Sequence, residues 1–292
     1  MKKAKRFLIT IIIVIIAIVA GHIYYLTTFK GNEIFPNDTF LDKVTNKKAL
    51  IIVAHDDDAI GCSGTVAELT KKGWEIRFMT FYNNFWRVED NPIRKKEVAK
   101  VVSIQKLAGA DLIDFTIEKT DTVKQPWMPI PYSKFPDYFK IDSLKILIGN
   151  AIDKYNPSII FTLDNITGAY GHPAHVCVSK CVIDVCNEKK KNSDFSVKKI
   201  YQSVYTRTSS EKIMGKMDVY ISAKKVYQCE GMPIPDVEIN ISGSAKEKME
   251  TLLAYESQKR NLKKYVPYYN WYPYWIYFNV FDKEYFKIIT IN

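Results

Sequence analysis

Residues 51–65 read IIVAHDDDAIGCSGT, and this stretch decides how the chain is interpreted. An apolar run, which we predict to be a buried strand, leads directly into His55 and three consecutive carboxylates, Asp56, Asp57 and Asp58. Like charges so close together repel one another and shift each other's pKa values, so the cluster costs stability unless a cation neutralises it. The stretch therefore predicts a metal site where a strand ends.

Strand-like and helix-like segments alternate through the rest of the chain. Strands are predicted at residues 49–55, 75–82, 111–115, 158–163, 199–206 and 236–242. Helices are predicted at residues 64–73, 91–109, 142–157, 174–191 and 244–262. This alternation indicates an α/β fold that is Rossmann-like, with a mostly parallel sheet and helices on both faces. Ligands of such sheets bind beyond the carboxyl ends of the strands, where the HDDD cluster and a later TGAYGHPAH loop both lie.

The first 30 residues have the composition of a transmembrane helix. The basic segment MKKAKRF precedes an uncharged, mostly apolar run from Leu8 to Leu26, long enough to cross a hydrocarbon core of about 30 Å. The positive-inside rule places the N-terminus in the cytoplasm and the remaining chain outside it. A cleaved signal peptide ending at Ala20 is the alternative. We expect an anchor, because the apolar run continues past Ala20.

The chain after this helix is expected to form one large domain. We assign residues 1–30 to the membrane anchor, 31–48 to a polar linker and 49–292 to the catalytic domain with an aromatic-rich C-terminal extension. That extension has 12 aromatic residues between Tyr265 and Phe286. We expect it to extend the sheet and cover the core. Stacking on sugar rings and resting at a membrane interface are the alternatives.

Composition excludes several classes of protein. The net charge is +10, but the lysines are scattered and no reading motif is present, so we expect no nucleic-acid partner. The sequence has no G-x-G-x-x-G or P-loop pattern, so a nucleotide cofactor is not supported. Five cysteines, an odd number without regular spacing, argue against a disulfide framework.

The distribution of histidines supports a metal site. Of four histidines, His22 lies in the N-terminal apolar run, and the other three fall in loops at the presumed carboxyl edge of the sheet. A catalytic zinc takes three His or carboxylate ligands and leaves one position for water. His55, one aspartate of residues 56–58, and His175 would supply that set. The alternative is that His172 or His175 only caps a helix or satisfies a loop hydrogen bond.

Four segments, in order, resemble the PIG-L/LmbE-like de-N-acetylases, which remove acetyl groups from N-acetylglucosaminyl compounds. IIVAHDDDAIGCSGT is similar to the family's AHPDDE and GxGGT signature, and TGAYGHPAHVCV at residues 167–178 to its GHPDH motif. IRKKEVAKVVSIQKLAGA at residues 93–110 resembles its R-x-x-E helix, with Arg94 and Glu97 in the matching places. KMETLLAYESQ at residues 248–258 resembles a late A-H-x-S-Q segment and retains Ser257 and Gln258.

The resemblance implies three metal ligands: His55, Asp58 and His175. It implies that Asp57 is the general base, and that His172 steadies the tetrahedral intermediate or helps to protonate the leaving amine. The expected cofactor is Zn²⁺, with another divalent metal as the alternative. Arg94 is a candidate substrate-binding residue for a sugar or phosphate, and an ion pair with Glu97 or another neighbour is the alternative. Asp164, after a predicted strand, would line the site or cap a turn, and we expect the turn.

The sequence departs from the family pattern at several positions. Asp56 replaces a proline, Ala59 a glutamate, Ala174 an aspartate, and Tyr255 a histidine that is often present. If a gap fell at the proline position, the base and the ligand would be Asp56 and Asp57. We expect the ungapped alignment, because the His-x-x-Asp spacing lets His55 and Asp58 reach one metal around the turn. Loss of the aspartate at 174 removes a partner that would orient an imidazole.

The sequence therefore predicts a zinc-dependent N-deacetylase that acts on an N-acetylglucosamine-containing glycoconjugate, with its catalytic domain outside the cytoplasm. A non-catalytic carbohydrate-binding protein on the same fold is one alternative. A metal-dependent sugar esterase is another, because the same groups would hydrolyse an ester.

Overall fold

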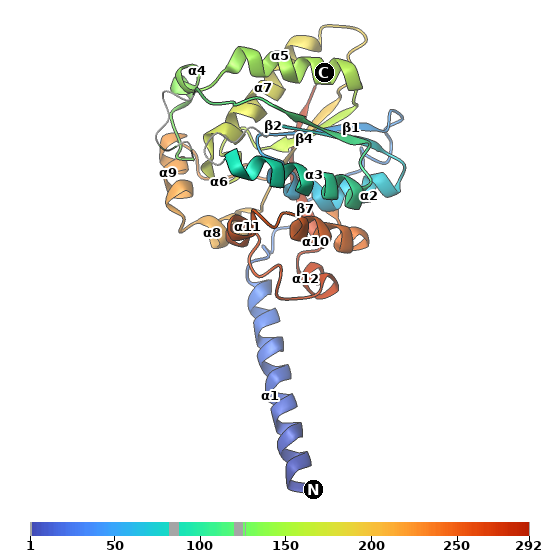
Figure 1. The fold of residues 1–292 in the computed structure, drawn as a ribbon, viewed down its shortest axis with the longest axis vertical. Helices are drawn as coiled ribbons and strands as arrows, with labels where there is room; N and C mark the ends of the chain where they lie inside the picture. Colours follow the sequence, from blue (N-terminus) through green and yellow to red (C-terminus); the bar gives the residue numbers. More distant parts are fainter. Residues whose placement is uncertain (1, 82–87, 120–124, 126, 292) are drawn as a thin grey trace.

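A seven-stranded mixed sheet organises the domain (Figure 1). The computed structural model describes residues 2–81, 88–119, 125 and 127–291. The strand order is β3-β2-β1-β4-β5-β7-β6. The strands are β1 (Lys48–Val53), β2 (Glu75–Phe81), β3 (Gly109–Ile113), β4 (Ile159–Leu163), β5 (Lys199–Val204), β6 (Val237–Asn240) and β7 (Lys283–Thr290). Strands β1 to β5 are mutually parallel, as the alternation of elements predicts.

Strand β1 lies at the centre of the parallel part and is buried on both faces. Its Ile51 pairs with Phe78 of β2 on one side and Phe161 of β4 on the other. Leu50 and Ile52 belong to the core on one face of the sheet, and Ile51 and Val53 to the core on the opposite face. A strand covered on both faces reads as a continuous apolar run, and this explains the sequence that precedes His55.

Helices cover both faces of the sheet (Figure 1). On one face, α5 packs on α7, and on the other α10 packs on α2 and α3. The helices of the domain are α2 (Ser63–Lys71), α3 (Asn91–Gln105), α4 (Phe135–Tyr138), α5 (Ile141–Tyr155), α6 (Gly168–Gly171), α7 (Pro173–Lys189), α8 (Arg207–Met214), α9 (Asp218–Val226), α10 (Ala245–Ala254), α11 (Lys259–Tyr265) and α12 (Tyr274–Val280). Short 3₁₀ turns include η1 (Asp56–Cys62).

The C-terminal chain enters the sheet between two earlier strands. Strand β7 is antiparallel to β5 on one side and to β6 on the other. Its Tyr285 and Phe286 are buried, and Phe286 belongs to the main core. The expectation that part of the aromatic extension completes the sheet is thus confirmed for β7.

The single helix predicted over residues 244–262 is wrong, because the chain forms α10 and α11 with a break at residues 255–258. At the break, the Tyr255 hydroxyl donates to the Asp56 carbonyl over 2.6 Å. The Ser257 amide and hydroxyl both donate to Glu97, each over 2.7 Å. These long-range hydrogen bonds replace the helical ones, so tertiary contacts override local helix propensity.

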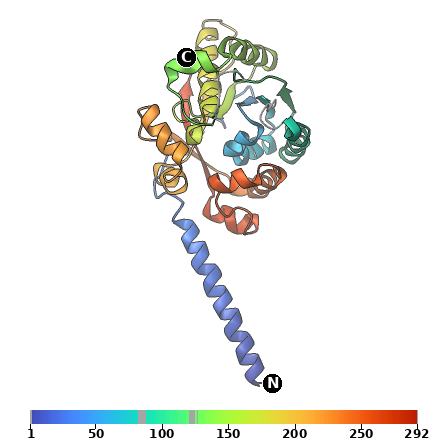
Figure 2. The same ribbon diagram turned by 60° about the vertical axis from the view of Figure 1, so that its left-hand side comes forward.

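The N-terminal helix α1 (Lys2–Thr27) projects from the domain, and α8, α11 and α12 lie on the side from which it emerges (Figures 1 and 2). Among the described residues it alone is long and apolar enough to cross a membrane. Its last turns are attached to the domain: Leu26 is fully buried, and Lys30 pairs with Asp282 over 2.5 Å. The following segment packs on the sheet, where the Glu238 amide donates to the Pro36 carbonyl over 2.9 Å.

Substitution of the central strand should destabilise the domain far more than substitution of a surface residue of the same type. Ile51 is 1% exposed in β1, so Ile51→Ala should lower the free energy of unfolding by about 2–5 kcal/mol. Ile34 is 86% exposed, and Ile34→Ala should change it by less than about 0.5 kcal/mol. Chemical denaturation of the detergent-solubilised full chain measures both. Equal effects would contradict this description of the core.

Candidate metal centre and active site

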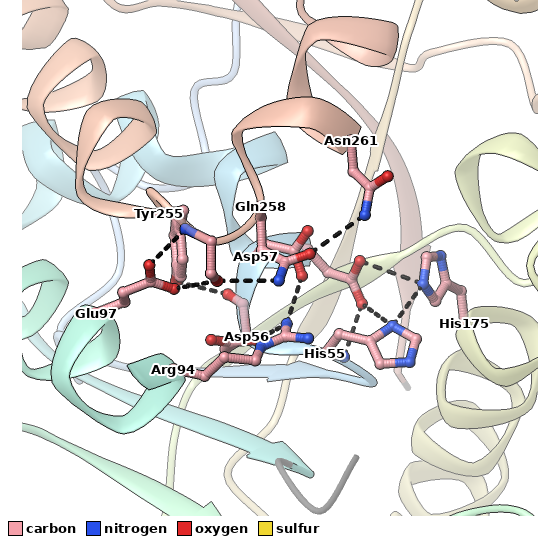
Figure 3. Close-up of polar contacts among 11 residues, drawn as sticks. His55, Asp56, Asp57, Arg94, Glu97, His175, Tyr255, Gln258 and Asn261 are labelled. Atoms are coloured by element: carbon pink, nitrogen blue, oxygen red, sulfur yellow. Dashed lines mark hydrogen bonds and ion pairs between the residues drawn. The ribbon is translucent and has the colours of Figure 1, made fainter. Parts of the chain in front are cut away.

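The site lies at the carboxyl ends of β1 and β4, which are parallel neighbours. His55 follows β1 by two residues and caps η1, and His172 caps the start of α7 after the loop that follows β4. Because parallel strands end at the same edge of a sheet, residues 120 positions apart meet there. Figure 3 shows His55 and His175 pointing toward one another.

Three side chains that could bind a metal, those of His55, Asp58 and His175, converge at this edge of the sheet. His55 Nδ1 lies 2.9 Å from His175 Nε2. The Asp58 carboxylate reaches both rings, with Oδ1 3.2 Å from His175 Nε2 and Oδ2 3.4 Å from His55 Nδ1. Asp58 Oδ2 also accepts the His55 backbone amide over 2.8 Å, so the turn itself holds the carboxylate in place. The three residues expected to be ligands are therefore in mutual contact.

The ligand atoms of His175 and Asp58 are in a state that suits a bound cation. His175 Nδ1 donates to the Gly168 carbonyl over 3.0 Å, and this bond fixes the tautomer that leaves Nε2 unprotonated in the neutral ring. Burial lowers the pKa of His175 to about 4, even though the neighbouring Asp58 charge opposes this shift. A lone pair of His175 and a carboxylate of Asp58 thus face each other in a buried site. A divalent metal would satisfy both.

His172 contacts both other histidines. Its ring stacks on His175 with centroids 4.5 Å apart and meets the edge of His55 at 4.9 Å. One ring nitrogen each of His55, His172 and His175 lies within 4.8 Å of the others. His172 Nδ1 accepts the Ala174 amide over 3.3 Å, so the capping role considered from the sequence is confirmed. Burial, with the two neighbouring imidazoles, lowers its pKa well below the usual value.

Arg94 occupies the opposite side of the carboxylate cluster. It is buried and its Nη2 donates to Asp57 Oδ1 over 2.7 Å and also to Asp56. Asp56 is 1% exposed, so Arg94 neutralises a carboxylate that has no access to solvent. Burial and the Asp58 charge raise the pKa of Asp57. The ion pair considered from the sequence exists, but its partners are these aspartates, whereas Glu97 binds Ser257.

Residues of the late motif, at 248–258, form hydrogen bonds with the residues around the carboxylate cluster. The Tyr255 hydroxyl binds the Asp56 carbonyl, as described above, so the residue at the usual histidine position reaches the first motif. Gln258 Nε2 donates to Ser257 Oγ over 3.0 Å, and Asn261 donates to Gln258 over 3.3 Å. Figure 3 shows this chain of polar groups running from Glu97 past Gln258. The four motifs of the sequence therefore meet at one place.

Asp164 stabilises the loop that delivers the two later histidines. It is fully buried and accepts the backbone amides of Ile166, Thr167 and Ala169 over 2.6–3.0 Å, so the expected turn is confirmed. Gly168 has φ +57°, and a Cβ there would come within 2.7 Å of the His175 Cβ. The loop conformation that brings the Gly168 carbonyl to His175 therefore requires glycine.

Sequence reasoning did not single out two tyrosines of the site. The Tyr170 ring lies edge-on to His175 at 5.2 Å and stacks on Tyr265 at 4.3 Å. Tyr170 lies inside the TGAYGHPAH loop and Tyr265 is the first residue of the aromatic extension, so both were in segments of interest, but the sequence did not distinguish a site residue from a core residue.

Ala174 is fully buried and contributes its backbone amide to His172.

A cavity of about 650 Å³ opens over the centre. His55, Asp57, Asp58, His172 and His175 line one part of it. Apolar side chains of α8 and α12, including Met214 and Phe278, line another part, which extends to Lys30 just beyond α1. Arg94 also lies in the wall, whereas Asp56 does not. The volume is in the range of small-molecule sites and exceeds the needs of one acetamido group.

Comparison with known proteins supports the sequence resemblance. Residues 50–186 match the family model described as PIG-L: GlcNAc-PI de-N-acetylase. No curated protein matches the sequence. The match ends within α7, so β5 to β7 and the late motif lie outside it.

Solved structures share the fold at low sequence identity. An N,N'-diacetylchitobiose deacetylase from Pyrococcus horikoshii is 17% identical with a TM-score of 0.52, covering 86% of each chain. The teicoplanin deacetylase Orf2, in a zinc-inhibited form, is 14% identical with a TM-score of 0.53, covering 83% of this chain and 98% of its own. A 4-carboxy-2-hydroxymuconate hydratase from Pseudomonas putida KT2440 is 12% identical with a TM-score of 0.50, covering 75% and 82%. The fold therefore serves more than one reaction.

Zinc content should test the prediction that His175 is a metal ligand and His172 is not. We expect about one zinc per wild-type chain, a large loss in His175→Ala, and retention in His172→Ala. His22→Ala, a histidine outside the centre, is the matched control and should retain zinc. Elemental analysis after dialysis measures all four proteins. Equal loss of zinc in His172→Ala and His175→Ala would instead assign the metal to the three histidines.

Removal of Arg94 should destabilise the domain. Arg94→Met leaves Asp56 buried without its cation, so the free energy of unfolding should fall by about 3–5 kcal/mol. Arg207 forms an exposed pair with Glu230, and Arg207→Met should leave the unfolding transition unchanged. Denaturation curves of the two variants test this. An unchanged transition in Arg94→Met would show that the buried pair is not needed.

Proposed function

We propose that the protein is a metal-dependent de-N-acetylase that acts on an N-acetylglucosamine-containing glycoconjugate. Residues 50–186 match the PIG-L family model, and the proposal starts from that match. The observation that carries the proposal is the contact of Asp58 with both His55 and His175, beside the Oδ2 atom of Asp57, which has no partner among the residues that the structure describes. Water cleaves the acetamide, and the products are acetate and the free amine of the sugar. The match to the family and the similarity to deacetylases support this reaction.

We assign the metal to His55, Asp58 and His175, with Zn²⁺ as the expected ion. When bound, this ion would polarise the acetamide carbonyl and lower the pKa of water toward about 7. His172 is the alternative third ligand. Asp58 is favoured because its oxygens lie 3.2 Å from His175 Nε2 and 3.4 Å from His55 Nδ1, so one ion could bind all three groups.

Asp57 is assigned as the general base. Arg94 binds its Oδ1, which orients the carboxylate and leaves Oδ2 to take the proton of the attacking water. The alternative base, Asp56, is buried behind Arg94 and does not line the cavity. This arrangement supports the ungapped alignment, in which Asp57 is the base and Asp58 the ligand. The proposed contact of Arg94 with substrate rests on its place in the cavity wall, and we assign it first to the positioning of Asp57.

His172 is assigned as a neutral hydrogen-bond donor. Because Nδ1 accepts the Ala174 amide, the proton of the neutral ring is on Nε2. Its lowered pKa keeps the ring neutral, so Nε2–H can donate to the oxyanion as it develops and then to the leaving nitrogen. The proton that Asp57 takes from water can pass to the amine, which balances the reaction without another reactant.

The cavity supports a substrate larger than one sugar. Its apolar part under α8 and α12 is continuous with the polar part at the histidines. An N-acetyl-hexosamine joined to a further sugar, lipid or aromatic group would occupy both parts. The anchor at α1 favours a substrate of the cell envelope, and we propose that the domain acts outside the cytoplasm.

Acetate release from N-acetylglucosamine conjugates tests the assignment. Asp57→Asn keeps an acceptor for Arg94 but cannot take a proton, so kcat should fall by about 10²–10⁴-fold with zinc retained. Asp56→Asn is the matched control for charge, and it should keep more activity than Asp57→Asn.

Three results would contradict the proposal. Greater loss in Asp56→Asn than in Asp57→Asn would assign the base to Asp56. Hydrolysis of O-acetyl but not N-acetyl sugars would indicate an esterase. Sugar binding by a chain that holds no zinc and releases no acetate would indicate a carbohydrate-binding protein.

A further inference from the structure

An exposed aromatic surface is formed by the segment after α11 and the first turn of α12, outside the catalytic site. We call it the aromatic platform, and it comprises Tyr268, Trp271, Tyr272, Tyr274 and Trp275. Trp271 and Trp275 are each 62% exposed, and Tyr274 is 39% exposed. Exposure of two tryptophans to water is unfavourable in free energy, because each presents a large apolar area to the solvent.

The platform is packed against the last turns of α1. The His22 ring stacks on Trp271 with centroids 5.3 Å apart and planes at 15°, and on Tyr272 at 5.6 Å. Tyr268 meets His22 edge-on at 4.9 Å. His22 Nδ1 lies 2.6 Å from the Tyr272 hydroxyl, which is a hydrogen bond. His22, the only histidine in the apolar run, therefore joins α1 to the platform.

These contacts fix the level of the platform along α1. His22 lies four residues before Leu26, where the mostly apolar run ends, so it is about 6 Å from that end at 1.5 Å per residue. If α1 crosses a bilayer, Trp271 lies at the boundary between hydrocarbon and headgroups. Trp and Tyr are enriched at that boundary because their rings have an apolar body and a polar edge. Tyr24 and Tyr25, both exposed, lie on α1 at the same level.

The charge next to the platform fits a lipid surface. Helix α11 has the sequence KRNLKKY, with no acidic residue, and it lies on the α1 side of the domain (Figures 1 and 2). Its basic side chains are exposed: Lys259, Arg260, Lys263 and Lys264. Basic residues held near a membrane surface are attracted to anionic lipid headgroups. Aromatic and basic groups thus gather where α1 leaves the domain.

We propose that the aromatic platform lies in the interfacial region of the bilayer that α1 spans, with α11 over anionic headgroups. The domain is then held against the membrane in one orientation by two attachments, α1 and the platform. The surface around Val266 and Pro267, which precede the platform and line the cavity, faces the lipid. This proposal does not depend on the reaction that the domain catalyses.

Quenching of tryptophan emission by brominated lipids tests the proposal. The full chain, which has five tryptophans, is reconstituted into vesicles of phosphatidylcholine and phosphatidylglycerol. The phosphatidylcholine carries bromine either close to the headgroup or close to the bilayer centre. We expect stronger quenching by the shallow bromine, and loss of this quenching in Trp271→Phe/Trp275→Phe.

Trp127→Phe is the matched control, because Trp127 is also half exposed but lies in the cavity wall. It should lower the total emission and keep the lipid-quenched part, and circular dichroism checks that all variants are folded. Unchanged quenching in the double variant would overturn the proposal. Wild-type emission that neither bromine position quenches would overturn it too, and cross-linking to a dimer in that case would assign the platform to a second copy of the chain.

Discussion

Three consecutive carboxylates at the end of β1, those of Asp56, Asp57 and Asp58, each require a polar partner, and the elements that supply these partners are packed around them. The 3₁₀ turn directs Asp58 toward the histidines, whereas Asp56 and Asp57 turn toward Arg94 of α3. The loop after β4, the N-terminus of α7 and the break between α10 and α11 are all shaped by contacts with this cluster or with its partners. A buried charge is tolerated only with such partners, so the elements around β1 have little freedom to move.

Sequence reasoning identified the parts of the structure that local patterns encode. The continuous apolar run of β1, the alternation of elements and the histidine positions were enough to predict the α/β fold and the meeting of His55 with His175. Long-range contacts could not be predicted in the same way. The entry of β7 between β5 and β6 depends on pairing with strands far away in the sequence. The break at Tyr255 depends on a carbonyl 199 residues distant, and the Arg94–Asp56 pair required the fold to be known.

The fold of this protein does not by itself indicate which reaction it catalyses. A hydratase with a similar fold shows that the sheet and its helices do not select a reaction. Under the proposed function, the reaction depends on the side chains at the strand ends, where a carboxylate touches two histidines and a second carboxylate is held by an arginine. The aromatic platform adds a different kind of constraint, because it packs on the last turns of α1 and so fixes how the domain is attached to that helix. The C-terminal extension thus completes the sheet through β7 and places exposed tryptophans on the outer surface.

X-ray absorption at the zinc edge of the purified full chain would test the assignment of the metal to His55, Asp58 and His175, because it reports the atoms around the metal without a substrate. We predict two imidazole nitrogens at about 2.0–2.1 Å, together with light oxygen ligands from one carboxylate and water, in fourfold coordination. Three imidazoles around the ion would contradict the assignment of Asp58. A chain that takes up no zinc when the ion is supplied would contradict the metal centre itself.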